Sequence, residues 1–268
     1  MASIISSPNP SPNQNDILAA LSSDDYQKLL PDLELVPMPL DLVLCEPGEK
    51  PKYAYFPVSA ITCMLNVLRN DESVEIAVIG FDGFVGIALF MGGDRSPWRV
   101  VVQSPGFAYR IKATVLKREF RQNGNLRHLV MIYTLSLITQ MAQTAVCNRH
   151  HSVVQQLCRW LLTTLDRLPS NKLNMTQGHI ARMLGVRRVC ITGAAGKLQE
   201  EGLIQYSRGN ILVLDRPGLE KRVCECYAVV EKEASRLLSF RIRHPRHSLC
   251  HAKPVVRRVN FPQNSGQV

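Results

Sequence analysis

The amino-acid sequence predicts an α+β protein with an antiparallel β-roll in its N-terminal half, a long central helix and a C-terminal winged helix-turn-helix. Three observations predict this fold class. Short β-prone runs alternate with prolines and glycines from Leu33 to Arg110, a helical pattern without Pro or Gly runs from Leu126 to His150, and a helix–turn–helix–hairpin pattern follows from Thr176 to Leu214. The 268 residues suffice for two modest domains, each with its own core.

The composition favours a cytoplasmic protein with a polyanionic partner. The formal net charge of +10 does not by itself choose between nucleic acid and a membrane surface. Eight scattered cysteines indicate reduced thiols rather than a disulfide framework. No apolar run approaches the ~20 residues of a membrane span, and the polar start lacks the features of a secretory signal. We therefore expect no interaction with a membrane.

The N-terminal half divides into a tail and a roll domain. We predict a disordered tail over residues 1–15 and the roll over residues 16–125. An amphipathic helical pattern from Asp16 to Leu30 opens the domain, and evenly spaced strand-like runs with turn signals follow. The glycine-dense stretch from Gly80 to Gly93 matches neither a P-loop nor a Rossmann fingerprint, so it indicates a tight corner of the roll.

The helix predicted over residues 126–150 carries apolar side chains on two sides. One stripe consists of Leu126, Val130, Tyr133, Leu137 and Met141. A second stripe consists of Leu135, Ile138, Ala142 and Ala145. Because a helix that is apolar on two sides has to be covered on two sides, we interpret it as a dimerisation helix. The predicted dimer contacts are Val130, Tyr133, Leu137 and Met141; burial within one large monomer is the alternative.

Residues 176–198 have the pattern of a helix-turn-helix. Thr176 is suited to cap a first helix, and Gly185 allows the positive φ that a sharp turn requires. The inward positions of the two helices are Ile180, Ala181, Leu184, Ile191, Ala194 or Ala195, and Leu198. Two β-prone runs around a glycine-containing turn follow in residues 203–214, which is typical of a wing. We place this winged domain at residues 151–238.

The outward side of the second helix is basic at its N-terminal end, which suits the major groove of DNA. We expect base edges or the groove floor to be contacted by Arg187, Arg188, Val189, Thr192 and Gly193. The expected contacts to the DNA backbone are Gln177 at the start of the first helix, Lys197, and Arg208 at the wing tip, and Thr176 is a further candidate DNA-binding residue. An ordinary helical hairpin with a solvated basic face is the alternative.

This order of elements resembles the Crp–Fnr family of bacterial transcription regulators, from about Asp16 to Leu238. The most specific segments are PLDLVLCEPGE, YFPVSAI, EIAVIGFDGFVGIALFMGG, QMAQTAVCNRHH, QQLCRWLL and MTQGHIARMLGVRR. The resemblance implies that the roll is a cyclic-nucleotide-binding-like jelly roll that senses an effector. It also implies a homodimer that binds near-palindromic double-stranded DNA, with RNA polymerase as a further candidate partner.

The chain departs from the family members that bind cyclic AMP or GMP. Those members use a glutamate of a Gly-Glu-(Leu/Ile) element for the ribose and an arginine of an Arg-Ser/Ala pair for the cyclic phosphate. The corresponding effector-pocket candidates here are Gly86, Ile87, Ala88, Arg95 and Ser96. Because Ile87 stands where the acid would be, we do not expect a cyclic nucleotide, and we identify no cofactor.

The recognition helix also departs from the family pattern of an arginine followed by a glutamate. Arg188 is present, but Val189 replaces the acid, which removes an acceptor for cytosine and leaves a side chain suited to a thymine methyl group. Gly193 removes a further base-reading side chain. A module that keeps the fold but binds a small ligand or a protein partner without reading DNA is therefore the alternative function.

Enzymatic activity is not expected. The sequence contains no nucleophile elbow, no His-Glu-x-x-His motif and no Gly-Lys-Ser/Thr phosphate loop. Its carboxylates are scattered, so no general acid–base pair stands out. We expect no catalytic residue.

Cysteine and histidine clusters raise the question of a metal. Cys147 is followed by His150 and His151 at ligand spacing on a helix, but we interpret them as a buried cysteine with histidines at a hinge. Cys224 and Cys226 are predicted to lie on one helix, where residues two apart point away from each other. We therefore expect no metal site among these residues.

The last residues, 239–268, are predicted to be a disordered basic tail. We expect this tail either to contact the DNA backbone nonspecifically or to be a solvated segment without a role. It contains a second group with zinc-like spacing, His244, His247, Cys250 and His251, but no packed context surrounds it.

Overall fold

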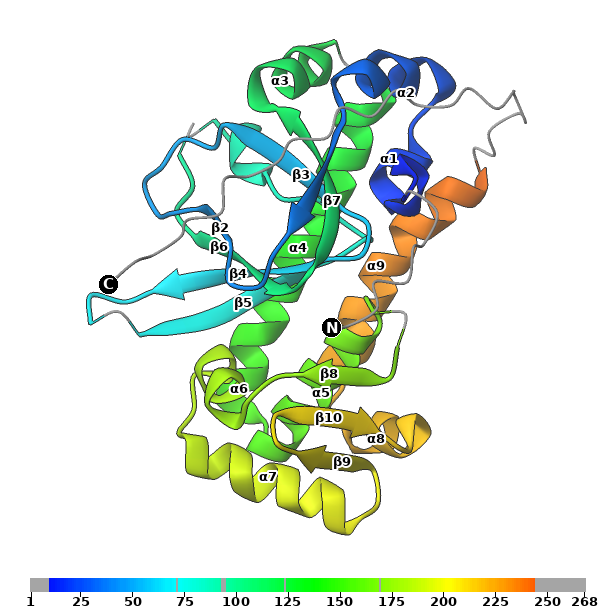
Figure 1. The fold of residues 1–268 in the computed structure, drawn as a ribbon. Coiled ribbons are helices and arrows are strands. Elements are labelled where there is room, and N and C mark those ends of the chain that lie inside the picture. Colours follow the sequence, from blue (N-terminus) through cyan, green and yellow to red (C-terminus); the bar gives the residue numbers. More distant parts are fainter. Residues whose placement is uncertain (1–9, 71, 93–94, 123, 169, 244–268) are drawn as a thin grey trace, which may run out of the picture.

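The computed structural model describes residues 10–70, 72–92, 95–122, 124–168 and 170–243. A β-roll lies at one end of the molecule and a winged helix-turn-helix at the other, with the long helix α4 running between them (Figure 1). The predicted fold class is confirmed.

Residues 10–15 belong to the roll domain, so the predicted disordered tail is wrong for this segment. A short 3-10 helix (Pro12–Gln14) leads into Asn15, which is fully buried. The Asn15 amide donates hydrogen bonds to the carbonyl oxygens of Pro57 (2.9 Å) and Gly83 (2.7 Å). Its side-chain oxygen caps the next helix. Residues 1–9 of the predicted tail lie outside the described residues.

The predicted N-terminal helix is divided into two. It forms α1 (Asp16–Ala20) and α2 (Ser23–Leu29), followed by a 3-10 turn (Leu30–Asp32). The break occurs because Leu21 is extended and the Ser22 hydroxyl accepts from Asp25 N, which starts a new helix.

Two antiparallel sheets form the roll. The strands are β1 (Glu34–Met38), β2 (Val43–Cys45), β3 (Tyr53–Pro57), β4 (Ile61–Val67), β5 (Ser73–Ile79), β6 (Arg99–Ser104) and β7 (Gly106–Lys112). One sheet has the order β1-β7-β3 and the other β2-β6-β4-β5. A 3-10 turn (Ile87–Leu89) and α3 (Ala113–Arg121) complete the domain. Its core contains the stacked rings of Phe56 and Phe84.

One face of α4 (Asn125–His150) closes the core of the roll. Val130, Tyr133 and Leu137 are buried there, and Met141 packs against the same cluster. The prediction that these residues contact a second subunit is therefore wrong for the three buried ones. The spacing revealed two stripes but could not show which of them faces the roll.

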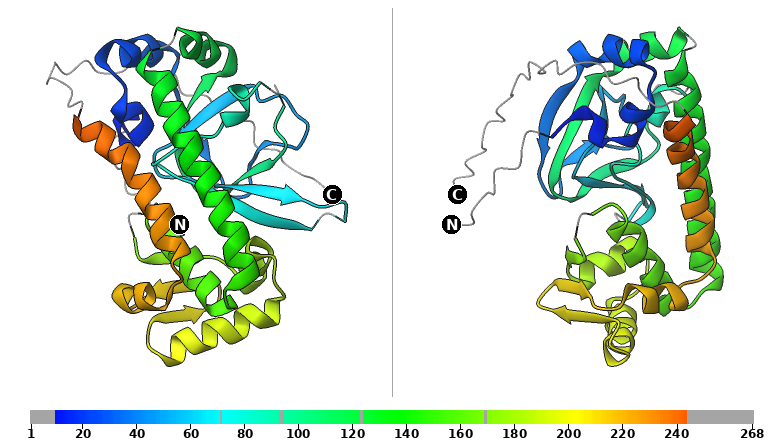
Figure 2. Two further views of the ribbon diagram at one scale, coloured as in Figure 1. Left: turned by 180° about the vertical axis from the view of Figure 1, so that it is seen from behind. Right: turned by 90° about the vertical axis from the view of Figure 1, so that its right-hand side faces the viewer.

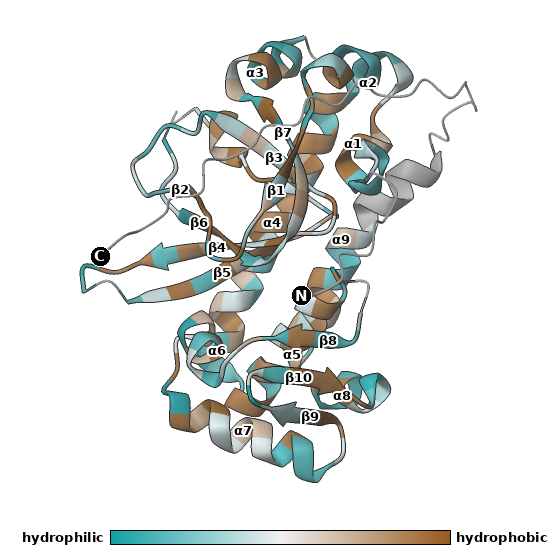
Figure 3. Cartoon of the chain, in the orientation of Figure 1, coloured by the Kyte–Doolittle hydropathy of each residue, from teal (hydrophilic) through white to brown (hydrophobic). Residues whose placement is uncertain are grey.

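The other stripe of α4 is the exposed one. Met131, Leu135, Ile138 and Val146 are each between 45% and 58% exposed. Apolar segments of α4 are coloured brown in Figure 3. By length and composition α4 would also suffice to cross a membrane, although polar residues interrupt its apolar sequence. Its inner face, however, is covered by the roll.

The C-terminal domain is built on α5 (Val153–Leu165). It continues with β8 (Lys172–Asn174), α6 (Gln177–Leu184), α7 (Arg188–Glu200), β9 (Ile204–Ser207), β10 (Asn210–Val213) and α8 (Arg216–Arg222). The wing sheet has the order β8-β10-β9, so β8 adds a strand that the sequence pattern did not indicate. The domain core surrounds the buried Trp160 and Leu161 of α5.

The last described helix, α9 (Cys226–Arg243), leaves the winged domain and returns along α4 toward α1. Seen from behind, α4 and α9 lie side by side (Figure 2). Residues 239–243 are helical, so the predicted start of the disordered tail at residue 239 is wrong. The rest of that tail, with its His/Cys group, lies outside the described residues.

The roll packs directly on the winged domain. Cys63 and Leu65 of β4 belong to the same buried cluster as Trp160. Arg167, just beyond α5, forms an ion pair with Asp82 of the roll, with Nη2–Oδ2 and Nε–Oδ1 distances of 2.5 and 3.0 Å. The helix-turn-helix is thus held against the roll within one chain.

Candidate nucleic-acid interface

The turn between α6 and α7 has the predicted geometry. The Thr176 hydroxyl accepts a hydrogen bond from His179 N (3.2 Å) and caps α6. Gly185 ends α6 with a φ of 65°, a left-handed conformation that favours glycine. Val186 N then donates to Ala181 O (3.0 Å), which closes the corner.

Helix α7 presents an apolar inner side and an open outer side. Ile191, Ala194, Ala195 and Leu198 are buried against the domain core, as predicted. Val189 is 70% exposed, and Arg188, Thr192, Gly193 and Lys197 are exposed around it. The predicted base-reading residues therefore share one solvent-facing surface.

A hydrogen bond fixes the start of α6 against this surface. The Thr192 hydroxyl donates to Gln177 Oε1 (2.7 Å), and the same hydroxyl lies 3.2 Å from Arg188 O. Gln177 therefore stands beside α7, and the hydrogen bond joins the two helices of the motif. The pKa of His179 is lowered by burial and by the charge of Arg182, which favours a neutral imidazole at this position.

Four cations of the predicted interface have no carboxylate partner among the described residues. Arg187, Arg188, Lys197 and Arg208 are exposed, and none of them forms an ion pair within the part of the chain that the structure describes. In contrast, Arg222 of the same domain is paired with Glu201. The charge of the four cations is therefore available to an external anion.

The wing tip presents one of these cations. Arg208 and Gly209 have φ values of 49° and 81° and connect β9 to β10, with Ser207 opposite Asn210. Two successive positive φ values are characteristic of a type I′ hairpin turn. The turn places Arg208 at the exposed end of the wing sheet.

Two glycines of α7, Gly193 and Gly196, leave the helix backbone without a side chain and with open space beside it. A Cβ atom added at Gly193 or Gly196 would have no heavy atom within 4 Å beyond its immediate chain neighbours and the helix's own backbone. Each glycine costs the helix about 1 kcal/mol relative to alanine. Packing against the described residues does not explain these glycines, whereas a ligand that closely approaches the helix would.

Comparison with known proteins agrees with this geometry. Residues 155–222 match the family model of the Crp-like helix-turn-helix domain. They form a Crp-like helix-turn-helix domain. No curated protein matches the chain.

Solved structures extend the likeness to the fold of the whole chain. A transcriptional regulator assigned to the Crp/Fnr family of Eubacterium rectale is 16% identical, with 80% of this chain and 98% of that chain covered and a TM-score of 0.60. FixK2 of Bradyrhizobium japonicum is 13% identical (72% and 98% covered, TM-score 0.60). The c-di-GMP-responsive regulator CLP of Xanthomonas campestris is 15% identical (72% and 100% covered, TM-score 0.59). The chain thus has the fold of Crp–Fnr regulators.

The predicted effector pocket lies inside the roll. Gly86, Ile87, Ala88 and Ser96 line a cavity together with aromatic and aliphatic side chains. Its free space is ≈ 20 Å³, which is room for about one water molecule. Arg95 is not among the lining residues and donates to Gly48 O (2.6 Å). The cavity therefore brings together four of the five predicted effector-pocket residues, without Arg95.

A second cavity, which the sequence did not reveal, lies where the roll, α5 and α9 meet. Its free space is ≈ 180 Å³. The lining residues are Asp16, Phe81, Asp82, Thr163, Asp166, Arg167, Tyr227, Val230, Glu231, Ala234 and Ser235. They come from segments far apart in the sequence, so no local motif could indicate the cavity.

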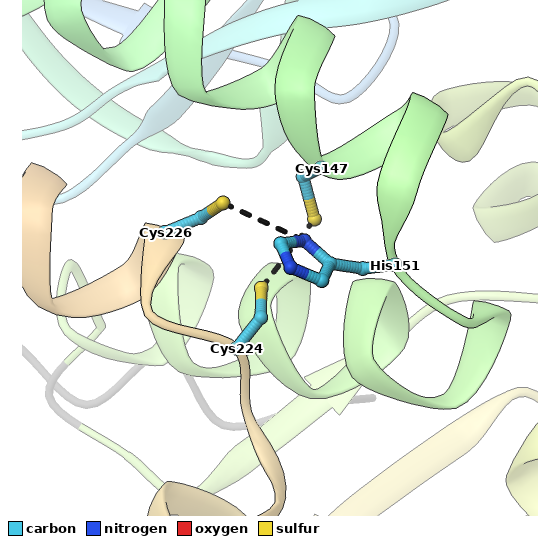
Figure 4. A group of neighbouring side chains, drawn as sticks. All are labelled: Cys147, His151, Cys224 and Cys226. Atoms are coloured by element: carbon cyan, nitrogen blue, oxygen red, sulfur yellow. Dashed lines mark hydrogen bonds between the residues drawn. The ribbon is translucent and has the colours of Figure 1, made fainter.

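Where the end of α4 meets the start of α9, four potential ligand side chains converge. Cys147, His151, Cys224 and Cys226 offer ligand atoms that all lie within 4.8 Å of one another (Figure 4). The prediction that Cys224 and Cys226 point apart on one helix is wrong, because α9 begins at Cys226 and Cys224 lies in the preceding turn. His150, in contrast, is exposed and stays outside the group.

Proposed function

We propose that the chain is a transcription regulator that binds double-stranded DNA with α7 in the major groove. The observation that carries this proposal is the set of four exposed cations on α7, its N-terminal flank and the wing of a Crp-like helix-turn-helix domain, which have no ion-pair partner among the described residues. Phosphate contacts supply most of the affinity of such proteins, and base edges supply the specificity.

Each predicted contact has a role in this arrangement. Arg188, at the first position of α7, is suited to the two acceptors of a guanine, and the exposed Val189 to a thymine methyl group. Arg187, Thr192 and Gly193 would contribute to the groove contact. Thr176, Gln177, Lys197 and Arg208 surround this region and would bind phosphates.

The operator would be near-palindromic because the protein would act as a dimer. The exposed stripe of α4 (Met131, Leu135, Ile138 and Val146) is suited to pair with the same stripe of a second copy, since isologous contacts are the commonest in oligomers. Scattered apolar residues are normal on a surface, but a continuous helical stripe favours an interface.

The roll would supply the regulatory input from an effector that we do not identify. Its contacts with the Crp-like domain, including the Asp82–Arg167 pair, offer a route by which a change in the roll would move α7. We place the protein in the cytoplasm, assign it no enzymatic activity and keep RNA polymerase as a candidate partner.

Selection of bound duplexes from a random pool tests this function and requires no assumption about the operator sequence. We expect enrichment of one near-palindromic sequence by the full chain and no enrichment by Arg188→Ala. Binding of the whole pool without enrichment would mean that the protein contacts only the DNA backbone and does not read the base sequence. Absence of binding by an intact dimer would favour the alternative, an interaction module that does not read DNA.

A further inference from the structure

We propose that Cys147, His151, Cys224 and Cys226 bind a single thiophilic divalent cation, for which Zn²⁺ is the best fit. Cys147 lies in the last turn of α4 and His151 directly follows this helix. Cys224 lies between α8 and α9, and Cys226 is the first residue of α9. Three thiolates and one imidazole are a ligand set that closed, structural zinc sites use.

Two distances between ligand atoms are close to those of a mononuclear site. Cys147 Sγ and Cys224 Sγ are 3.6 Å apart, and Cys226 Sγ is 3.6 Å from His151 Nδ1 (Figure 4). A tetrahedral ion with Zn–S bonds of about 2.3 Å separates its ligand atoms by roughly 3.8 Å. A four-iron cluster has one ligand on each iron and requires a wider group. The spacing therefore favours one ion.

The histidine is oriented for ligation. Its Nδ1 faces the sulfur atoms, while its Nε2 lies 3.4 Å from Oε2 of Glu225. A carboxylate on the second ring nitrogen fixes the tautomer and the ring orientation in many zinc sites. Gln156 donates to the backbone oxygen of His151 (2.9 Å) and so holds the end of α4 in place.

The surroundings also compensate the charge of the site. Zn²⁺ with three thiolates carries one net negative charge. Arg159, a buried residue of α5, directs its Nε at Cys147 Sγ (3.2 Å) and its Nη1 at Thr144 Oγ1 (3.3 Å). Beside a thiolate, this buried cation offsets the negative charge.

The position of the site gives the ion a structural consequence. The three sulfur atoms belong to buried residues, and two ligands belong to the end of α4 while two belong to the turn that begins α9. An ion there would hold α9 against α4 at the point where the Crp-like domain joins the central helix. The site is independent of the DNA contacts on α7.

The test uses the full chain, purified without chelator, with metal content measured by mass spectrometry. We expect one Zn²⁺ per chain in the wild type. After removal of the ion, Co²⁺ should give the visible bands and the thiolate charge-transfer absorption of a tetrahedral sulfur-rich site. Chelation should lower the Tm of the wild type.

Matched variants assign the ion to these residues. Cys224→Ser should lose the ion and the Co²⁺ charge-transfer band, whereas Cys190→Ser, an exposed thiol of α7, should keep both. Cys250→Ser should also keep both, which excludes the His/Cys group of the tail. Glu225→Gln leaves all four ligands in place and should weaken metal affinity by about 10- to 100-fold, so the proposal stays testable if Cys224→Ser fails to fold.

Several results would overturn the proposal. One is a wild-type protein that carries no stoichiometric metal and binds no Co²⁺. Another is equal Co²⁺ binding by Cys224→Ser and Cys190→Ser. A third is iron together with inorganic sulfide in the purified wild type. A disulfide between Cys147 and Cys224 in protein purified under reductant would also contradict the metal site, because these two residues would then form a redox pair.

Discussion

Single residues decide how α7 could meet DNA. The sequence alone indicated the cap at Thr176, the turn at Gly185 and the exposure of Arg188, because each depends on local backbone chemistry. Whether the cations were free of carboxylates depended on residues elsewhere in the fold. That property became visible only in the structure.

Gly193→Ala should separate stability from binding. With open space beyond the added methyl group, we expect the variant to gain about 1 kcal/mol of stability and to bind DNA more weakly, because the helix would approach the groove less closely. Gly196→Ala, one turn farther from the N-terminal end, should gain similar stability with a smaller loss of affinity. Thermal melting and titration with duplex measure the two effects; unchanged affinity of Gly193→Ala would contradict the close approach.

Glu75 should make stability depend on pH. Burial raises the pKa of this carboxyl to about 8, although the charges of Arg159 and Arg167 act in the opposite direction. The folded protein therefore holds a proton that the unfolded chain releases at ordinary carboxyl pKa, so the contribution of Glu75 to stability falls as pH rises from about 4.5 to about 8.

Replacement by an uncharged isostere should remove this dependence. The Tm of Glu75→Gln, relative to that of the wild type, should rise between pH 5 and pH 8. Thermal melting at the two pH values, with Glu72→Gln on the exposed end of the same hairpin as control, measures the difference. A constant difference across this range would show that Glu75 is ionised in the folded protein.

At the scale of elements, periodicity predicted where helices occur better than which face each one buries. It located α4 within one residue but assigned the dimer contact to Val130, Tyr133 and Leu137, which the roll covers. The strand β8 escaped notice because three residues carry no periodic signal. Contacts between elements that are distant in the sequence determine both which face of α4 is buried and where β8 forms.

The exposed stripe of α4 leads to a prediction at this scale. Leu135→Glu should shift the protein from dimer to monomer in sedimentation velocity, because two like charges would be buried opposite each other at a two-fold contact. Leu68→Glu, an equally exposed leucine at the end of β4, should leave the dimer intact. A dimer of unchanged strength in Leu135→Glu would place the interface elsewhere.

At the scale of the molecule, the contact between the roll and the Crp-like domain links the two halves of the chain. Removal of Asp82 would leave the buried Arg167 without its partner, which costs about 3 kcal/mol or more in comparable sites. Asp82→Ala should therefore lower stability strongly, while the double variant Asp82→Ala/Arg167→Met should recover part of the loss. Denaturant unfolding of all four members of this cycle measures the coupling, and additive effects would show that the pair contributes nothing.

The Cys/His group belongs to the same scale. Its four members were all visible in the sequence, but Cys147 and Cys224 lie 77 residues apart along the chain and converge only because α9 returns to α4. The same return helix builds the larger cavity. Both features depend on tertiary structure, which local pattern does not encode.

The central claim is that α7 reads DNA, and fluorescence anisotropy tests it most directly. The wild type, Arg188→Ala and Arg121→Ala, which loses the same charge on the remote α3, would be titrated with a selected duplex and a scrambled duplex across a salt series. We predict a preference of ~10³ or more for the selected duplex, which Arg188→Ala loses and Arg121→Ala retains. Equal and steeply salt-dependent binding of both duplexes by the wild type would contradict sequence readout by this helix.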